Sequence, residues 1–146
     1  MRIFLDISAL IKLYHYESGS DEVDKVFDNF SIEEIYLSEL TKIEFQSAIW
    51  KKVRIKEITK KVAKDLINAF ENDFNKYNFI NINSDLIDSA QVLIMKFGIE
   101  GLRTLDSIQL ASIEVIKNKI SIAISTDDLL EKFIKQLGIK TISILK

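Results

Sequence analysis

Cysteine is absent from this sequence of 146 residues, and histidine occurs once, at position 15. A chain without cysteine has no disulfide framework, no thiolate nucleophile and no Cys-rich zinc site. A single His15 leaves no histidine cluster that could hold a metal. Any metal ion bound by this chain must therefore have oxygen ligands.

Proline is also absent, and glycine occurs only four times, so the commonest signals of a domain boundary are missing. The sequence contains no internal repeat, no low-complexity tract and no Gly/Ser/Pro-rich linker. We expect one domain that covers residues 1–146. No apolar run approaches the ~20 residues of a membrane span, and the few apolar residues before Asp6 are too short for a signal peptide. We therefore expect a cytoplasmic protein with no membrane association.

An overall excess of positive charge is missing as well. The net charge of −2 and the pI near 5.5 exclude a protein that holds nucleic acid through its total charge. Any contact with nucleic acid must then be local. The strongest local asymmetry lies between Lys51 and Lys64, where lysines and Arg54 face a single acid, Glu57. We interpret this stretch as a solvated helix face, with a phosphate-binding patch as the alternative.

Short Ile-rich runs alternate along the chain with longer helical patterns. The runs predict buried strands at residues 3–5, 35–37, 79–82, 120–125 and 141–145. The helical patterns cover residues 8–16, 20–30, 38–53, 59–77, 84–97, 105–117 and 128–137, with Gly98 and Gly138 as helix stops. This alternation predicts an α/β fold with a central, mainly parallel sheet flanked by helices. The helical stripe Phe70, Phe74 and Tyr77 is expected in the core or at a subunit interface.

Two aspartates come after predicted strands and precede predicted helices. Asp6 comes after Phe4-Leu5, and Asp127 comes after the run that ends at Ser125. Each could simply cap the helix that follows it. In open parallel sheets, however, ligands bind beyond the carboxyl ends of the strands, near a switch in strand order. These two positions therefore also suit a functional site.

Two further acids lie on predicted helices. Glu44 shares a mostly apolar or small face with Ile43 and Ser47, so it must reach solvent, pair with Lys51 two turns away, or bind a metal. Asp106 lies in a first helical turn, where the helix dipole alone favours an acid. If the fold brings all four carboxylates together, they raise one another's pKa values unless a cation neutralises them. Oxygen ligands of this kind suit Mg²⁺ or Mn²⁺.

Four segments that contain these acids stand in a fixed order along the chain. They are Phe4-Leu5-Asp6-Ile7-Ser8-Ala9-Leu10, Leu37-Ser38-Glu39-Leu40-Thr41-Lys42-Ile43-Glu44, Gly101-Leu102-Arg103-Thr104-Leu105-Asp106-Ser107-Ile108-Gln109, and Ser125-Thr126-Asp127-Asp128. In this order and at these separations, the segments resemble the PIN-domain ribonucleases, and among them the VapC-type toxins of prokaryotic toxin–antitoxin pairs. The resemblance extends over almost the whole chain, although no single segment is diagnostic. Gln109 departs from it, because many relatives have histidine there.

The resemblance implies a PIN-like domain that hydrolyses RNA phosphodiester bonds with Mg²⁺ or Mn²⁺ and acts as the toxin of a type II pair. It implies that the metal ligands are Asp6, Glu44, Asp106 and Asp127, with the Ser8 hydroxyl supporting Asp6. It also implies an RNA substrate, a homodimer and a small cognate antitoxin.

One alternative is a non-catalytic PIN-like RNA-binding module, in which the acids are only caps and ion pairs. A phosphotransfer domain fits less well, because Asp6-Ile7-Ser8 lacks the second aspartate of a DxD nucleophile motif. Helical angles favour Asp127 over Asp128 as the fourth ligand. Counted back from the buried face that includes Leu130, Asp127 lies about 60° from Leu130, whereas Asp128 lies about 160° away.

Overall fold

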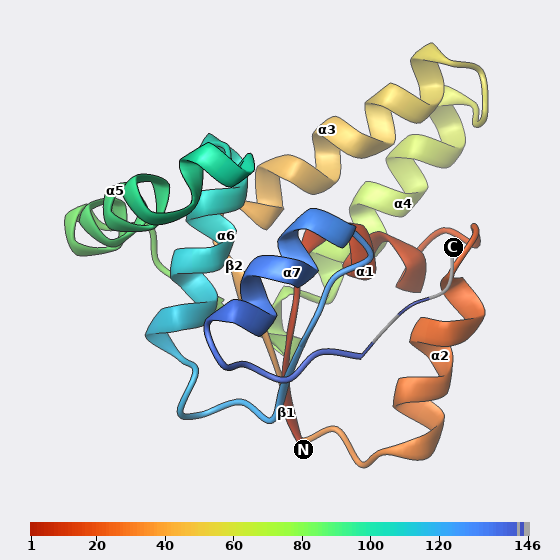
Figure 1. Ribbon diagram of the computed structural model, residues 1–146. Coiled ribbons are helices and arrows are strands. Elements are labelled where there is room, and N and C mark those ends of the chain that lie inside the picture. The colour runs from red at the N-terminus through yellow and green to blue at the C-terminus, as the bar shows by residue number, and fades with distance from the viewer. Residues whose placement is uncertain (143, 145–146) are drawn as a thin grey trace.

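The computed structural model describes residues 1–142 and 144, and its centre is a four-stranded sheet (Figure 1). The strands are β1 (Arg2–Leu5), β2 (Glu34–Ser38), β3 (Tyr77–Ile80) and β4 (Ile122–Ile124). They lie in the order β3-β2-β1-β4, and every neighbouring pair is parallel. The predicted α/β class with a parallel sheet is confirmed.

Seven α-helices connect or follow the strands among the described residues. They begin after capping side chains in several cases, as for Thr59, whose hydroxyl accepts a hydrogen bond from the Val62 amide. The helices are α1 (Ile7–Leu10), α2 (Ser20–Asn29), α3 (Thr41–Arg54), α4 (Lys60–Asn72), α5 (Ser84–Phe97), α6 (Thr104–Val115) and α7 (Asp128–Gln136), with short 3-10 turns η1 (Ile11–Leu13), η2 (Phe74–Lys76) and η3 (Gly98–Glu100).

The sheet is covered on both faces because its strands are apolar on both sides. Successive residues of β1 point to opposite faces: Ile3 and Leu5 pack into one cluster and Phe4 into the other. The first cluster includes side chains of α1 to α4, and the second includes those of α5, α6 and α7 (Figure 1). The result is a three-layer α/β/α arrangement, as the unbroken Ile-rich runs predicted.

The strand order reverses at β1. The chain moves from β1 outward to β2 and β3, and then returns to place β4 on the other side of β1. Leu5 pairs with Ile124 in this register, so the residues that follow β1 and β4 lie next to each other. The carboxyl ends of β1 and β4 thus form the switch point at which open α/β sheets bind ligands.

Several predicted boundaries were wrong. The strand predicted at residues 79–82 begins at Tyr77, because Tyr77 pairs with Ile35 of β2 and the preceding helix has already ended at Asn72. The first predicted helix divides into α1 and η1. Ser38, expected to open a helix, is the last residue of β2, where its hydroxyl accepts from the Leu40 amide.

The predicted last strand is also wrong for the residues described. Thr141 forms one isolated bridge with Ala123, Ile142 and Ile144 lie outside any strand, and residues 143 and 145 lie outside the described residues. Gly138 stops α7 with a φ of 78°, as predicted. Gly98 ends α5 but keeps a right-handed φ of −58°, and the left-handed turn falls instead at Gly101, whose φ is 107°.

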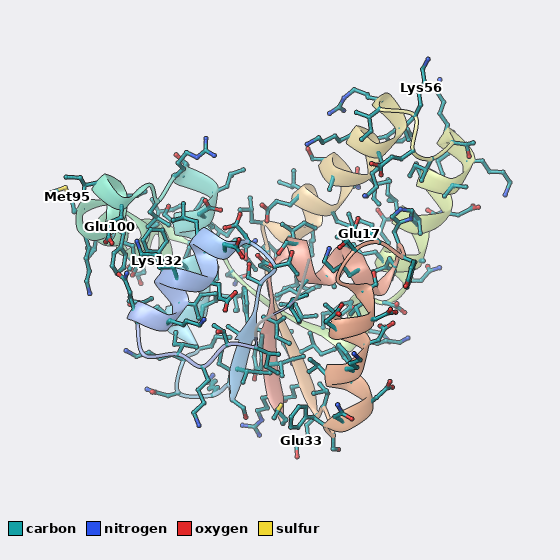
Figure 2. The ribbon with its side chains drawn as sticks, turned by 45° about the vertical axis from the view of Figure 1, so that its right-hand side comes forward. Glu17, Glu33, Lys56, Met95, Glu100 and Lys132 are labelled. Atoms are coloured by element: carbon teal, nitrogen blue, oxygen red, sulfur yellow. The ribbon has the colours of Figure 1, made fainter. Side chains whose placement is uncertain are left out.

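Helices α3 and α4 form a hairpin that extends beyond the sheet, with Lys56 at its tip (Figures 1 and 2). Its base is held by an aromatic cluster in which buried Phe70 contacts Tyr14, Phe45 and Phe74 at ring-centroid distances of 4.4–5.6 Å. The stripe that includes Phe70 therefore belongs to the core. No helix in the described part of the chain combines the length and apolarity that a membrane span requires.

Candidate active site

Asp6 lies at the switch point, directly after β1, and is only 3% exposed. Its Oδ1 accepts hydrogen bonds from the Ser8 hydroxyl at 2.6 Å and the Ala9 amide at 3.0 Å, and its Oδ2 accepts from the Ser125 hydroxyl at 2.6 Å. Burial raises the pKa of Asp6 above its usual range, against the lowering effect of these donors. Asp6 is thus the N-cap of α1, as predicted, and it lies at the sheet's carboxyl edge, where its functional role stays a prediction.

Two serine hydroxyls join the ends of β1 and β4 around Asp6. Ser8 Oγ accepts from the Thr126 amide at 2.9 Å, and Ser125 Oγ accepts from the Asp127 amide at 3.0 Å. Each hydroxyl therefore donates its one hydrogen bond to Asp6, which is the arrangement expected for an ionised carboxylate that only accepts. The expected hydrogen bond from Ser8 is present. The role of Ser125 was missed, although pairing of Leu5 with Ile124 would have placed it beside Asp6.

Glu44 lies in the first turn of α3 and is half-buried. Burial raises its pKa to about 7, with smaller contributions from the charges of Asp6 and Asp106. The Gln109 side chain opposes this shift by donating from Nε2 to Glu44 Oε1 at 2.5 Å. Among the described residues, no ion pair joins Glu44 to Lys51, so the pairing considered from the sequence is absent.

Gln109 comes from α6 and is buried between Glu44 and Thr41. Its Nε2 also donates to the Thr41 hydroxyl at 3.3 Å, while its Oε1 is buried and finds no hydrogen-bond partner in the described part of the chain. A buried carbonyl oxygen without a partner costs about 1–3 kcal/mol. From the sequence, Gln109 was noted only as a departure from the pattern that the chain resembles. No feature of the sequence predicted that it would donate a hydrogen bond to Glu44.

Asp106 and Asp127 complete the set from two other helices. Asp106 lies half-buried in the first turn of α6, where burial and the charge of Asp127 raise its pKa, while Arg103 lowers it. Asp127 is the N-cap of α7, and its Oδ1 accepts from the Leu130 amide at 2.8 Å. Capping therefore explains the position of Asp127 in part, and its Oδ2 has no hydrogen-bond partner among the described residues.

The charges of the four carboxylates affect one another's pKa values in a closed ring. Asp127 raises the pKa values of Asp6 and Asp106, and the charges of Asp6 and Asp106 raise that of Glu44. None of the four forms an ion pair within the described residues. Segments far apart in the sequence thus bring four acids to one edge of the sheet, where the charge of Arg103 acts on Asp106 but no ion pair forms among the described residues.

The chemistry of these donors fits a hard divalent cation. All are carboxylates, and Mg²⁺ uses one or two carboxylates while keeping several waters. With the side chains as they stand, no three acidic or histidine groups of the described residues are arranged to hold one ion. The arrangement therefore suits a cation that is held by few protein ligands and completed by water or phosphate oxygens.

No protein-family model and no curated protein matches the sequence. Solved structures do resemble it at low identity. They include VapC20 of Mycobacterium tuberculosis, described as a Sarcin-Ricin loop cleaving toxin (TM-score 0.70, 14% identity, 99% of each chain), VapBC-1 of nontypeable Haemophilus influenzae (0.65, 12%, 98% of each chain) and a Klebsiella pneumoniae toxin–antitoxin complex (0.61, 17%, 86% of each chain).

These likenesses establish the fold. The chain has the PIN-like α/β fold that is seen in VapC toxins, and the likeness to VapC20 extends over nearly all of both chains. Since identities this low carry the fold alone, the chemistry of the site has to be argued from the residues of this chain.

Proposed function

We propose that this chain is a Mg²⁺- or Mn²⁺-dependent endoribonuclease and the toxin of a toxin–antitoxin pair, acting on RNA in the cytoplasm. The observation that carries the proposal is the ring of Asp6, Glu44, Asp106 and Asp127 at the switch point of a parallel sheet, in which none of the four forms an ion pair within the described residues. The fold supports the same activity, because the similar protein VapC20 is described as cleaving the Sarcin-Ricin loop.

In the proposed reaction the four carboxylates would hold the metal between them, some directly and the others through its bound water molecules. A bound divalent ion lowers the pKa of its water and stabilises charge on the phosphate in in-line hydrolysis. The protein's own part is to fix the ligands: Ser8 and Ser125 hold both oxygens of Asp6, and Gln109 holds Glu44. Asp127 uses Oδ1 to cap α7, which leaves Oδ2 without a hydrogen-bond partner among the described residues and available as a ligand.

The test is cleavage of end-labelled RNA by the purified protein with Mg²⁺, with Mn²⁺ and with a chelator. We expect cleavage only with metal, and a loss of at least a hundredfold in Asp6→Asn and Asp106→Asn, since each change removes a charged ligand and Asn still caps a helix. Asp88→Asn, an exposed acid on α5, is the matched control and should cleave like the wild type.

Absence of metal-dependent cleavage by the wild type would overturn the nuclease. RNA binding without cleavage would support the non-catalytic RNA-binding module instead. Full activity in folded Asp6→Asn and Asp106→Asn variants would show that the four acids do not hold the metal.

The toxin role is a separate part of the proposal. Two of the similar structures are toxin–antitoxin complexes, which supports a small cognate antitoxin as the partner. Induced expression should stop the growth of a bacterial host, and Asp106→Asn should not. Harmless expression of soluble, active protein would exclude the toxin role and leave the nuclease intact.

A further inference from the structure

A groove of about 340 Å³ opens beside Glu44 and follows one face of α3. Its apolar side chains come from three helices that are far apart in the sequence: Ile7 of α1, Ile43 of α3 and Leu105 of α6. Two cations, Lys51 and Arg54, line the groove further along α3. The groove therefore starts at an acid of the candidate active site and continues onto the hairpin.

Glu44, Lys51 and Arg54 lie on one stripe of α3. At 1.5 Å per residue, Lys51 and Arg54 lie roughly 10 and 15 Å from Glu44 along the helix axis. Both are exposed, and neither side chain forms an ion pair or a hydrogen bond with any described residue. They are two cations without a protein partner, positioned in line with the acidic site.

Lys52, their neighbour, has a different role. Its Nζ pairs with Glu17 at 2.8 Å and with Glu57 at 3.3 Å, and Glu17 also pairs with Lys12 at 2.8 Å. Glu17 lies near the base of the hairpin, well below Lys56 at its tip (Figure 2). Lys52 therefore stabilises the hairpin through its ion pairs. The cations between Lys51 and Lys64 thus differ in their role.

The apolar side chains at the mouth of the groove need a partner as well. Ile43 is 71% exposed and Leu105 is 53% exposed, although both lie next to a charged site. Single-stranded RNA offers both features that the groove would recognise. Its phosphates suit the two cations, and its unstacked bases present apolar faces that a duplex keeps inside the helix.

We propose that this groove binds single-stranded RNA, with Lys51 and Arg54 contacting phosphates and with Ile43 and Leu105 packing against a base next to Glu44. The inference rests on the proposed function for its choice of RNA, and it adds which residues bind the strand and in which form. The charge favours RNA over a polypeptide, because the groove places two unpaired cations in line with a site that processes phosphodiesters.

The phosphate contacts are tested by salt dependence. An Asp106→Asn background prevents cleavage, and anisotropy of a labelled RNA strand with Mg²⁺ present reports binding. Lys51→Gln with Arg54→Gln should weaken binding roughly ten- to thirtyfold at 0.1 M salt and reduce the salt slope by about 0.7 for each lost phosphate contact. Lys60→Gln with Lys64→Gln, exposed on α4, removes the same charge and should leave the slope unchanged.

The base contact is tested by comparing one strand with its duplex. Ile43→Ser should weaken binding of the single strand by about threefold or more and leave duplex binding unchanged, since a duplex offers phosphates alone. Val115→Ser is the matched control, because Val115 is an exposed apolar residue on α6 outside the groove.

Equal slopes in the two double variants would overturn the phosphate contacts, and equal binding of strand and duplex would overturn the single-strand form. If the Lys51→Gln, Arg54→Gln double variant with Asp106 intact cleaves RNA as fast as the wild type, the groove does not bind the substrate, and the nuclease proposal stands. If the wild type binds the strand through the groove but does not cleave it, the nuclease proposal fails, and the groove proposal stands. A double variant that binds RNA normally but escapes inhibition by a partner protein would show that the groove binds a polypeptide instead.

Discussion

Glu44 is a carboxyl group of the site whose pKa is raised far above its ordinary value. Desolvation raises that pKa from its ordinary 4.5 to about 7, although Gln109 donates a hydrogen bond to the ionised form. Between these two pH values the folded, metal-free protein keeps a proton on Glu44 that the unfolded chain has released. The stabilising contribution of protonated Glu44 is therefore present at pH 4.5 and is lost as the pH rises through about 7.

Glu44→Gln should remove this pH dependence. Without metal, we expect the variant to have a Tm roughly 2–6 °C above the wild type at pH 8 and close to it at pH 4.5, because Gln keeps the hydrogen bond and cannot ionise. Thermal unfolding with a chelator at both pH values measures the difference. The control is Glu114→Gln, because Glu114 is also a half-buried acid but lies on α6. An identical pH profile in Glu44→Gln and wild type would contradict the assignment.

Helix α7 shows how a carboxylate that caps a helix can also belong to a cluster of acids. Asp127 caps the helix through Oδ1 and also acts electrostatically on Asp6 and Asp106, while buried Leu130 and Phe133 hold the helix against the sheet. The fixed helix in turn fixes Asp127. The expectation that Asp127 rather than Asp128 is the fourth metal ligand stays a prediction, to be tested by activity.

Replacing Asp127 in two ways separates its roles. Asp127→Asn should keep the cap and the Tm, because Asn caps as well as Asp, while Asp127→Ala should lose about 1 kcal/mol. Both should lose metal-dependent cleavage, whereas Asp128→Asn should keep it. Cleavage assays beside thermal unfolding give the answer. Cleavage that survives Asp127→Asn but not Asp128→Asn would reverse the assignment.

On the whole molecule, the two most exposed apolar side chains among the described residues come from neighbouring elements. Met95, at the end of α5, is 87% exposed and lies on the side of the molecule opposite Lys56 (Figure 2), and Ile99, in η3, is 98% exposed. A hollow of about 370 Å³ with a mostly apolar lining lies between α5 and α6, and Met95 contributes to it. A second copy of the chain is the partner that we propose for this face, following the homodimer that the family resemblance implies.

Met95→Lys with Ile99→Lys should convert a dimer into a monomer, because two charges would be buried in the proposed apolar contact. The measurement is the particle mass by light scattering across protein concentrations. Val62→Lys, on the exposed side of α4, should remain dimeric. A wild type that is monomeric at all concentrations, or an unchanged mass in the double variant, would exclude this face as the dimer contact.

The sequence by itself determined the fold class and the order of the main strands and helices from β1 to α7. The Ile-rich runs had to be strands buried on both faces, and the helical patterns between them required parallel connections. It also placed Asp6 and Asp127 at strand ends, because a carboxylate cannot continue a fully apolar strand. Helix α5 was predicted with its observed bounds, since Asn83 caps its start and its apolar period is regular.

Only the tertiary structure decided what depends on strand pairing and helix packing. Tyr77 became a strand residue because β2 offered it an edge, which no local pattern records. Pairing of Leu5 with Ile124 put Ser125 on Asp6, and the packing of α6 near α3 put Gln109 on Glu44. The same packing separated Lys52, bound to Glu17 and Glu57, from Lys51 and Arg54 in the groove. Apart from the pair Lys52–Glu57, these contacts join residues 35 to 119 positions apart, beyond the reach of any period read along the chain.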